Sequence, residues 1–381
     1  MSMKTALDTE RRSAYLHVPF CAHRCGYCDF TLVARRDDLI DVYLEALAIE
    51  LAKLERPREV DTLFFGGGTP THLPAPQLER LMSLARRWFA PSPGAEICVE
   101  ANPAGLDDTK VAILADAGVN RVSLGVQSFD TSVLELLERD HRGPEIPAVV
   151  ERVRRRIPNL GLDLIFGVPG QSIDLWKATL TAALALEPTH LSTYGLTFEK
   201  GTAFQSRLNK GLLDRCDEEA ERQMYALAMD ELPRAGFEQY ELSNFARPGF
   251  QCRHNEVYWA GKPFFGFGPG AARYAAGRRE LNHRSVTTWI NRVLAGRSPI
   301  AESEELSPEG RARELIMLNL RRCEGLALAE FREQTGFDFR ELAGEALSRH
   351  LRQGLLEERE GHVRLTREGR FLADTVFAEY V

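Results

Sequence analysis

The stretch Tyr15–Phe30 reads YLHVPFCAHRCGYCDF and joins a short apolar run to a cysteine-rich loop. The apolar run favours a buried strand. The loop carries three cysteines at offsets of four and three: Cys21, Cys25 and Cys28. Three thiolates on one loop can hold an iron–sulfur cluster or, with His17 or His23 as a fourth ligand, a closed zinc site. In the first case, one metal position stays open to another molecule.

Apolar runs of the same kind recur along the first half of the chain. They alternate with helical patterns such as DLIDVYLEALAIELAKL and PQLERLMSLARRWF. Parallel strands joined by helical crossovers have this appearance in a sequence. The predicted strands are Tyr15–Phe20, Thr62–Phe65, Glu96–Glu100, Arg121–Gly125, Gly161–Phe166 and His190–Gly195. The expected fold class is therefore α/β, with six β/α units.

Nearly every predicted strand runs straight into a polar or glycine-rich loop. These loops read CAHRCGYC, GGGTPTHL, EANPAG, GVQSFD and GVPGQS. Ligands of parallel α/β folds bind at the carboxyl ends of the strands, so the loops predict one shared active-site rim. A simple turn would explain any one of them, but five in succession favour a site.

The spacing Cys-x3-Cys-x2-Cys, followed by GGGTP at 66–70, resembles the signature of the radical S-adenosylmethionine family. Other segments resemble its HemN/HemW group, the coproporphyrinogen dehydrogenase-like branch: YLHVPFC, EANP, GVQSF, DLIFGVPGQ, YGLTFEKGTAF and YELSNFARPG. The resemblance covers essentially the whole chain. It implies an incomplete (β/α)6 barrel followed by a small α+β, winged-helix-like C-terminal domain.

The resemblance also implies a [4Fe-4S] cluster on the three cysteines, with S-adenosylmethionine at the open iron. Electron transfer would then yield a 5′-deoxyadenosyl radical, so the cofactor would supply the difficult chemistry. Glycine backbone would approach the methionine amino group closely, and Glu100 would accept a hydrogen bond from the cofactor. Arg139 fits a helix-surface charge equally well. The cofactor-site residues that the resemblance implies are Tyr15, Tyr27, Gly67, Gly68, Thr69, Glu100, Gln127, Arg139 and Asp163.

Two functions compete within this group. One is the oxygen-independent coproporphyrinogen III oxidase (dehydrogenase) of heme biosynthesis, and the other is a heme chaperone that delivers heme to respiratory proteins. The oxidase pattern has a further cysteine two places after the third, where this chain has Phe30 after Asp29. The oxidase also has a longer segment before its first strand. Both differences favour the chaperone, and a heme-degrading radical methyltransferase relative is a third, weaker alternative.

The segment His254–Trp259, HNEVYW, resembles an HNxxYW motif associated with the chaperone branch and with heme. Its imidazole would ligate heme iron, while Tyr258 and Trp259 would supply flat apolar surface. A buried, hydrogen-bonded histidine is the alternative. Gly195 stands where the resemblance implies a larger polar residue, and this departure falls in the pocket wall at the sixth strand.

The chain has 381 residues, enough for about two domains. We expect the barrel in residues 1–200, a covering segment in 201–304 and the C-terminal domain in 305–381. The net charge of -7 makes a nucleic-acid site unexpected, and the polar N-terminus MSMKTALDTERRS does not resemble a secretory signal. We therefore expect a cytoplasmic protein without disulfides, in which four cysteines are structural: Cys98, Cys216, Cys252 and Cys323. The expected partners are heme or porphyrin, heme-receiving respiratory proteins and a reductant protein, with transient docking at a membrane.

Overall fold

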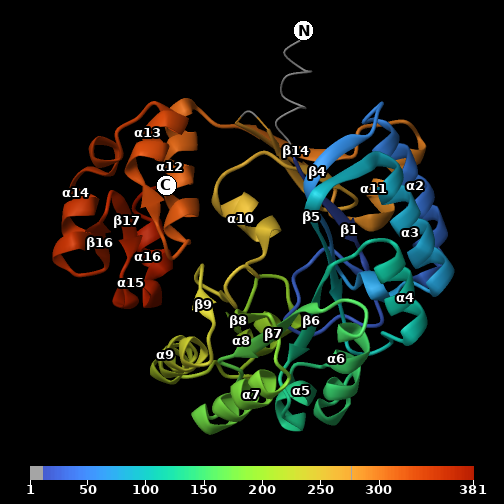
Figure 1. The fold of residues 1–381 in the computed structure, drawn as a ribbon, viewed down its shortest axis with the longest axis horizontal. Coiled ribbons are helices and arrows are strands. Elements are labelled where there is room, and N and C mark those ends of the chain that lie inside the picture. Colours follow the sequence, from blue (N-terminus) through green and yellow to red (C-terminus); the bar gives the residue numbers. More distant parts are fainter. Residues whose placement is uncertain (1–11, 276) are drawn as a thin grey trace.

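A mostly parallel sheet lies at the centre of the molecule, in a computed structural model that describes residues 12–275 and 277–381 (Figure 1). All six predicted strands are present, and they pair in chain order and in parallel. The predicted α/β class is confirmed. Residues 1–11, which begin the polar N-terminus and the expected segment 1–200, lie outside the described part. The six strands are β1 (Ser13–Val18), β4 (Arg58–Gly67), β5 (Phe89–Ala101), β6 (Arg121–Gln127), β7 (Asn159–Phe166) and β8 (His190–Gly195).

Helices cover the outer face of these strands, and β7 illustrates why. Leu160, Leu162 and Leu164 alternate along the strand and are buried in the main hydrophobic core. Because side chains of a strand alternate between its two faces, Asp163 points to the opposite, inner face. The covering helices are α2 (Ile40–Ala52), α3 (Ala75–Trp88), α4 (Asp108–Asp116), α6 (Ile146–Arg154) and α7 (Ile173–Ala185), whereas α5 (Thr131–Leu136) packs in a separate apolar cluster with Ile165 and Phe204. Short elements between them are β2 (Phe20–Cys21), β3 (Val33–Ala34) and the 3-10 turns η1 (Asp37–Leu39), η2 (Pro70–His72) and η3 (Gly143–Glu145).

Residues 201–304 extend the sheet at both edges, which goes beyond the expected covering role. At one edge β10 (Asn244–Ala246) pairs antiparallel with β8 and with β9 (Glu238–Gln239). At the other edge β11 (Phe265–Phe267) pairs in parallel with β1. The order is β11-β1-β4-β5-β6-β7-β8-β10-β9, and no pairing among the described residues joins β11 to β9. The barrel is therefore incomplete, as expected.

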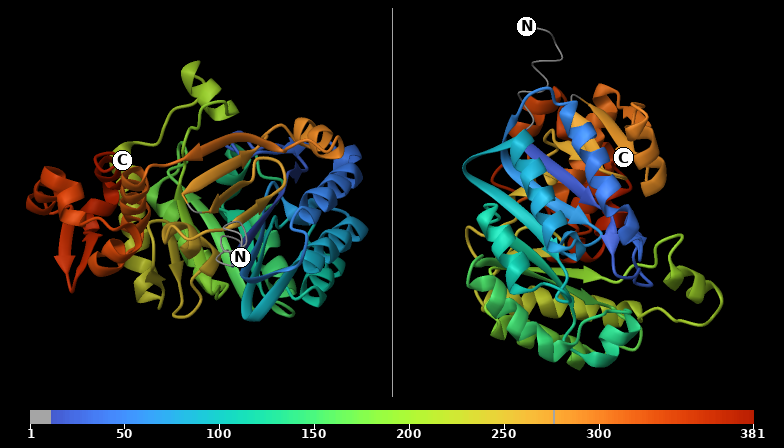
Figure 2. Two further views of the ribbon diagram at one scale, coloured as in Figure 1. Left: turned by 90° about the horizontal axis from the view of Figure 1, so that it is seen from above. Right: turned by 90° about the vertical axis from the view of Figure 1, so that its right-hand side faces the viewer.

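The same segment also forms elements outside the central sheet. Figure 2 shows α8 (Ala203–Asn209) projecting from the barrel on extended loops. The other elements are α9 (Glu218–Arg234), α10 (Arg253–Trp259), α11 (Val286–Leu294) and a small antiparallel sheet of β12 (Ala272–Ala275), β13 (Arg278–Asn282) and β14 (Ile300–Glu305).

The last part of the chain, which we call the C-terminal module (residues 306–381), has its own hydrophobic core and lies beside the β8 edge of the barrel (Figure 1). A main-chain bridge between Glu241 and Arg322 joins it to the barrel. The expected helices and two-stranded wing are present, and β15 adds a third strand. Its elements are α12 (Pro308–Leu320), β15 (Leu326–Ala327), α13 (Leu328–Thr335), α14 (Phe339–Arg352), β16 (Leu356–Arg359), β17 (His362–Leu365), α15 (Arg367–Phe371) and α16 (Ala373–Phe377).

Candidate functional site

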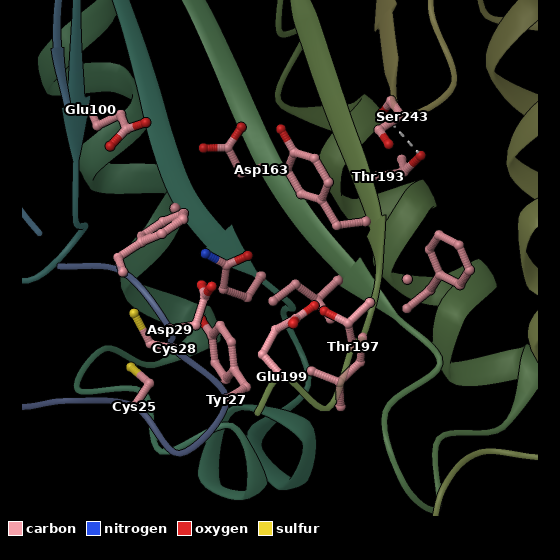
Figure 3. A pocket seen from close by; sticks show the side chains of 18 of the residues that line it. Cys25, Tyr27, Cys28, Asp29, Glu100, Asp163, Thr193, Thr197, Glu199 and Ser243 are labelled. Carbon is pink, nitrogen blue, oxygen red and sulfur yellow. Dashed lines mark hydrogen bonds between the residues drawn. The ribbon is translucent and has the colours of Figure 1, made fainter. Parts of the chain in front are cut away.

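A cavity of about 910 Å³ opens at the carboxyl ends of the parallel strands. Its walls come from the cysteine loop after β1, the loops after β4, β5 and β6, the inner faces of β7 and β8, and the C-terminal module. Figure 3 shows Cys25 and Cys28 on one side of this cavity, with Glu100 and Asp163 above them. The single rim predicted from the strand-end loops is thus formed by residues that are far apart in the chain.

The three loop cysteines all line this cavity and are free thiols. The Cys28 N–H donates to the Cys25 carbonyl at 3.1 Å, which forms a turn, and Cys21 Sγ lies 3.3 Å from Thr69 Oγ1. Burial raises the pKa of Cys21 to about 11 and raises the pKa of Cys28 as well. Without a metal centre the thiols of Cys21 and Cys28 keep their protons, and a bound cluster would take them up as thiolates instead.

Both histidines considered as zinc ligands bond to main-chain carbonyls, although His23 Nε2 also lies 3.7 Å from Cys25 Sγ. His17 is buried, with Nε2 2.6 Å from the Thr31 carbonyl and Nδ1 2.9 Å from the Tyr15 hydroxyl. His23 Nε2 bonds to the Glu138 carbonyl. Within residues 12–275 and 277–381, no three His, Cys, Asp or Glu side chains are placed to hold one metal ion. A cubane cluster does not require such convergence, because each of its cysteines binds a different iron.

Arg139 points into the cavity beside the cysteines and is not a helix-surface charge. Its Nη2 donates to the Gly125 carbonyl at 2.9 Å, and its Nη1 lies 3.6 Å from Cys25 Sγ. Tyr27 lines the same wall, and its ring meets Phe204 of α8 edge-on at 6.1 Å. A cation and an aromatic ring therefore adjoin the thiols, which suits a centre that carries several negative thiolate charges.

The GGGTP loop passes close to β1, and only glycine fits there. Gly67 has a φ of +115°, and a Cβ on it would lie 2.5 Å from the His17 ring. A Cβ on Gly68 would lie 2.7 Å from the Phe20 carbonyl oxygen. The main chain of this loop therefore forms a cradle, and at Gly67 and Gly68 there is no room for a side chain. Gly68 and Thr69 line the cavity, whereas Gly67 lies behind them.

Two carboxyl groups face the cavity from β5 and β7, the strands on either side of β6. Burial raises the pKa of Glu100 to about 8, although its Oε2 accepts a hydrogen bond from the Gly67 N–H at 3.0 Å. Burial also raises the pKa of Asp163, which accepts hydrogen bonds from Ser123 and Ser192. Carboxyl groups with raised pKa values in a cavity are typical of ligand or catalytic sites.

Most cofactor-site residues expected from the sequence gather around this cavity. Gln127 lines it at a bulge in β6, with a φ of +63° that is uncommon outside glycine. Tyr15 and Gly67 do not line it, but Gly67 bonds to Glu100, and Tyr15 bonds to His17 and stacks on Phe64. The expected residues that line the cavity are Cys21, Cys25, Tyr27, Cys28, Gly68, Thr69, Glu100, Gln127, Arg139 and Asp163.

His254 lies outside the cavity lining and is 1% exposed. Its Nδ1 is 2.7 Å from Thr62 Oγ1, and its Nε2 is 2.8 Å from the Tyr258 hydroxyl. Burial lowers its pKa to about 3. This placement matches the buried, hydrogen-bonded alternative. Iron ligation by His254 stays a prediction, and it would require one of these hydrogen bonds to break.

Several lining residues were not expected from the sequence. Glu221 of α9 approaches the position that Gly195 leaves free: a Cβ on Gly195 would lie 2.8 Å from Glu221 Oε1. The polar group missing from the sixth strand is thus supplied by a helix. The C-terminal module adds Arg321, Arg370 and Leu372. No local motif marks these residues, although the alternation of polar residues along β5 to β8 could have identified the inner faces.

Comparisons with known proteins show to which family the chain belongs. A family model of the Radical SAM superfamily matches residues 15–183, and a model of the HemN C-terminal domain matches residues 306–372. The heme chaperone HemW of Bacillus subtilis is 37% identical over 376 residues, covering 97% of this chain and 99% of that protein. The chain belongs to the HemW family of radical SAM proteins.

Other members of the family match over a similar span. The heme chaperones HemW of Mycobacterium tuberculosis and Escherichia coli are 39% and 32% identical and cover 95% and 96% of this chain. In those alignments 93% and 96% of the relatives are covered. The solved structure of coproporphyrinogen III oxidase (HemN) from Escherichia coli, a radical SAM enzyme, has a TM-score of 0.86 and covers 98% of this chain and 91% of that one. At 24% identity, this likeness shows the fold alone.

Proposed function

We propose that this protein is a heme chaperone that binds heme in the cavity and delivers it to respiratory proteins. The observation that carries the proposal is the match to HemW of Bacillus subtilis along 97% of the chain, because it includes the C-terminal module as well as the barrel. The cavity supports it, since about 910 Å³ is large for a small-molecule site, and its lining mixes aromatic and charged groups.

We further propose that Cys21, Cys25 and Cys28 hold a [4Fe-4S] cluster and that S-adenosylmethionine binds beside it. When bound, these groups supply one-electron chemistry. The donor set fits: three free thiols on one loop adjoin a cradle that excludes side chains. Backbone carbonyls of the cradle would accept hydrogen bonds from the methionine amino group, while Glu100 would orient a hydroxyl or ammonium group of the cofactor.

Coproporphyrinogen oxidation is the alternative, since the chain shares its fold with the Escherichia coli oxidase. The residues around the cluster loop argue against it. Asp29 and Phe30 line the cavity where the oxidase pattern carries its additional cysteine, and Phe30 is 57% exposed. An exposed phenyl ring cannot replace a thiol in redox or metal chemistry, but it can meet a flat apolar cargo.

We also propose a cytoplasmic location, an electron-donating partner protein and brief visits to a membrane surface, where respiratory proteins would receive the heme. Among the described residues, no helix is long and apolar enough to cross a bilayer. Separately, we propose that delivery relies on docking to the recipient. The recipients would be identified by transfer of heme from the loaded protein to candidate apoproteins.

Two assays on the anaerobically reconstituted protein test the proposal. Titration with hemin should give a saturable Soret band at one heme per chain. Incubation with coproporphyrinogen III, S-adenosylmethionine and reductant should give no protoporphyrinogen. Formation of protoporphyrinogen would replace the chaperone with the oxidase, and absence of saturable hemin binding would overturn the heme proposal outright.

A further inference from the structure

Two arginines of the C-terminal module form the cavity wall near the β8 edge. Arg321 follows α12, and Arg370 lies in α15. They are separate in sequence, and neither belongs to a motif of the barrel. Both line the same cavity as the cysteine loop, so a molecule in the cavity can meet the cluster side and the arginine side together.

The main chain and an indole ring hold Arg321 in place. Its carbonyl accepts a hydrogen bond from the Leu242 N–H at 3.2 Å. Its guanidinium carbon lies 4.5 Å from the centre of the Trp259 ring, in a cation–π contact. Trp259 closes the HNEVYW segment, which is tied further to α12 by a hydrogen bond from Asn319 to the Trp259 carbonyl. The segment thus reaches the cavity indirectly, by positioning Arg321.

The guanidinium of Arg321 has unused hydrogen-bonding capacity. Within the described part of the chain it donates no hydrogen bond, and its nearest acid is Glu241, whose Oε2 lies 3.9 Å from Nη2. Glu241 is 1% exposed and already accepts hydrogen bonds from Ser243 and Asn244 through its other oxygen. The long ion pair balances one buried charge but leaves the two terminal nitrogens of the guanidinium, though not its buried Nε, open to an anion.

Arg370 also has hydrogen-bonding capacity that its neighbours leave unfilled. Its Nη1 donates to Gln239 Oε1 at 2.7 Å, and its Nε finds no partner among the described residues. Its pairing is with a neutral amide, so its positive charge has no carboxylate partner in the described part of the chain. By contrast, Arg367 on the same helix forms an ion pair with Asp230 at 2.8 Å and does not line the cavity.

Apolar side chains lie exposed around the same cavity. Phe30 from the cysteine loop, Tyr194 from β8 and Leu372 from the module are 57%, 42% and 50% exposed, and all three line it. Large apolar side chains exposed together are unusual and mark a binding surface. With the two arginines at one wall, the cavity suits a broad apolar ligand that carries carboxylates on one side.

We propose that Arg321 and Arg370 bind the carboxylate side chains of the tetrapyrrole, with its apolar face against the exposed ring and aliphatic groups. The proposal rests on the proposed heme function and adds the orientation of the cargo: carboxylates toward the C-terminal module. In this arrangement Trp259 is a positioning residue, and it acts through Arg321.

The test compares hemin with hemin dimethyl ester, which has the same ring and iron but no free carboxylates. Arg370→Gln removes one charge, and Arg321→Lys keeps a charge near Glu241 while it removes the two terminal guanidinium nitrogens. Each variant should weaken hemin binding about tenfold and leave binding of the ester as in the wild type. Arg367→Gln and Arg322→Gln are matched controls on the same elements, and both should bind hemin normally. Far-UV circular dichroism and the cluster absorption confirm folding.

The outcomes separate the two proposals. If the wild type binds hemin about as weakly as the ester, or if both arginine variants bind hemin normally, the carboxylate site is refuted while heme binding stands. Equal losses for hemin and ester would also refute it, because they would report a damaged cavity. If the wild type binds neither compound, the heme function itself fails, and the arginine site fails with it.

Discussion

Glu100 keeps its proton up to mildly basic pH in the protein without cofactor. Burial raises its pKa to about 8, while a glutamate in the unfolded chain ionises near 4.5. Between these pH values the folded protein holds a proton that the unfolded chain has released. The free energy of unfolding therefore falls as the pH rises through this range.

We expect Glu100→Gln to remove this pH dependence, because the amide does not ionise. Between about pH 5 and about pH 8, the free energy of unfolding of the wild type should fall by roughly 2–4 kcal/mol. The variant should not show this fall. Denaturant unfolding of the cofactor-free protein at several pH values measures this difference. The exposed Glu45→Gln serves as control and should follow the wild type. An unchanged slope in Glu100→Gln would contradict the assignment.

Cys25 provides the second test at this scale. Anaerobic reconstitution should give about four iron and four sulfide per chain, with visible absorption that Cys25→Ala loses. Cys216→Ala, at a half-buried cysteine outside the cavity lining, should retain both. Iron content and absorption spectra provide the measurement. A reconstituted protein that contains zinc and no iron would refute the prediction of an iron–sulfur cluster.

Among the elements, the loop after β4 combines close packing with unusual backbone geometry. Gly67→Ala should destabilise the protein by roughly 2–4 kcal/mol, because the new methyl meets the buried His17 ring at a positive φ. Gly105→Ala is the matched control: its φ is +77°, but a Cβ there meets nothing within 4 Å. It should cost about 1 kcal/mol, the backbone strain alone. Similar losses in both variants would show that crowding at Gly67 is unimportant.

His254 in helix α10 is either a structural residue or a heme ligand, and one substitution distinguishes the two roles. A structural histidine would make His254→Phe cost about 1–3 kcal/mol, because Thr62 and Tyr258 lose a buried partner. The Soret band of the hemin complex would then stay at its wild-type wavelength. An axial ligand would instead shift or abolish that band. Unfolding curves and heme spectra of one variant therefore separate the two roles, with Tyr258→Phe as the milder companion.

At the scale of the whole molecule, the C-terminal module is attached by packing more than by surface charge. Phe371 meets Tyr225 edge-on at 5.6 Å and lies 4.4 Å from the Arg222 guanidinium. Phe371→Ala should cost about 2–3 kcal/mol, whereas Arg367→Gln, which breaks an exposed ion pair, should change stability by less than about 1 kcal/mol. Denaturant unfolding checks both values. The opposite order would mean that charges hold the module.

The sequence allowed the barrel to be predicted well, because its strands are buried on the helix side and end in recognisable loops. The short strands β10 and β11 were not predicted, since three residues carry no periodicity and depend on the sheet edge beside them. The domain limits drawn from the sequence stay predictions. The fold explains why residues 201–304 looked irregular: they supply both sheet edges and a separate small sheet.

The candidate site was predictable where a local motif carries it, as in the cysteine loop and the GGGTP cradle. Arg321, Arg370 and Glu221 escaped prediction because they reach the cavity only through tertiary packing. His254 shows the reverse case. Its motif led to the prediction that it ligates heme iron, yet the structure places the imidazole ring in a buried environment where both nitrogens are hydrogen-bonded.

The main-chain bridge between residues 240–242 and 321–323 limits how a bound molecule could leave the cavity. The Cys323 N–H donates to the Tyr240 carbonyl at 2.9 Å, and the Leu242 N–H donates to the Arg321 carbonyl. Swinging that side outward would break both hydrogen bonds, so under the proposed function we expect heme to leave by another side of the cavity. Phe30 and Leu372 stand uncovered at the cavity, and an acceptor protein arriving there would touch them before anything deeper. Under the proposed function, heme transfer would then take place at the protein surface and depend on apolar contact between donor and acceptor.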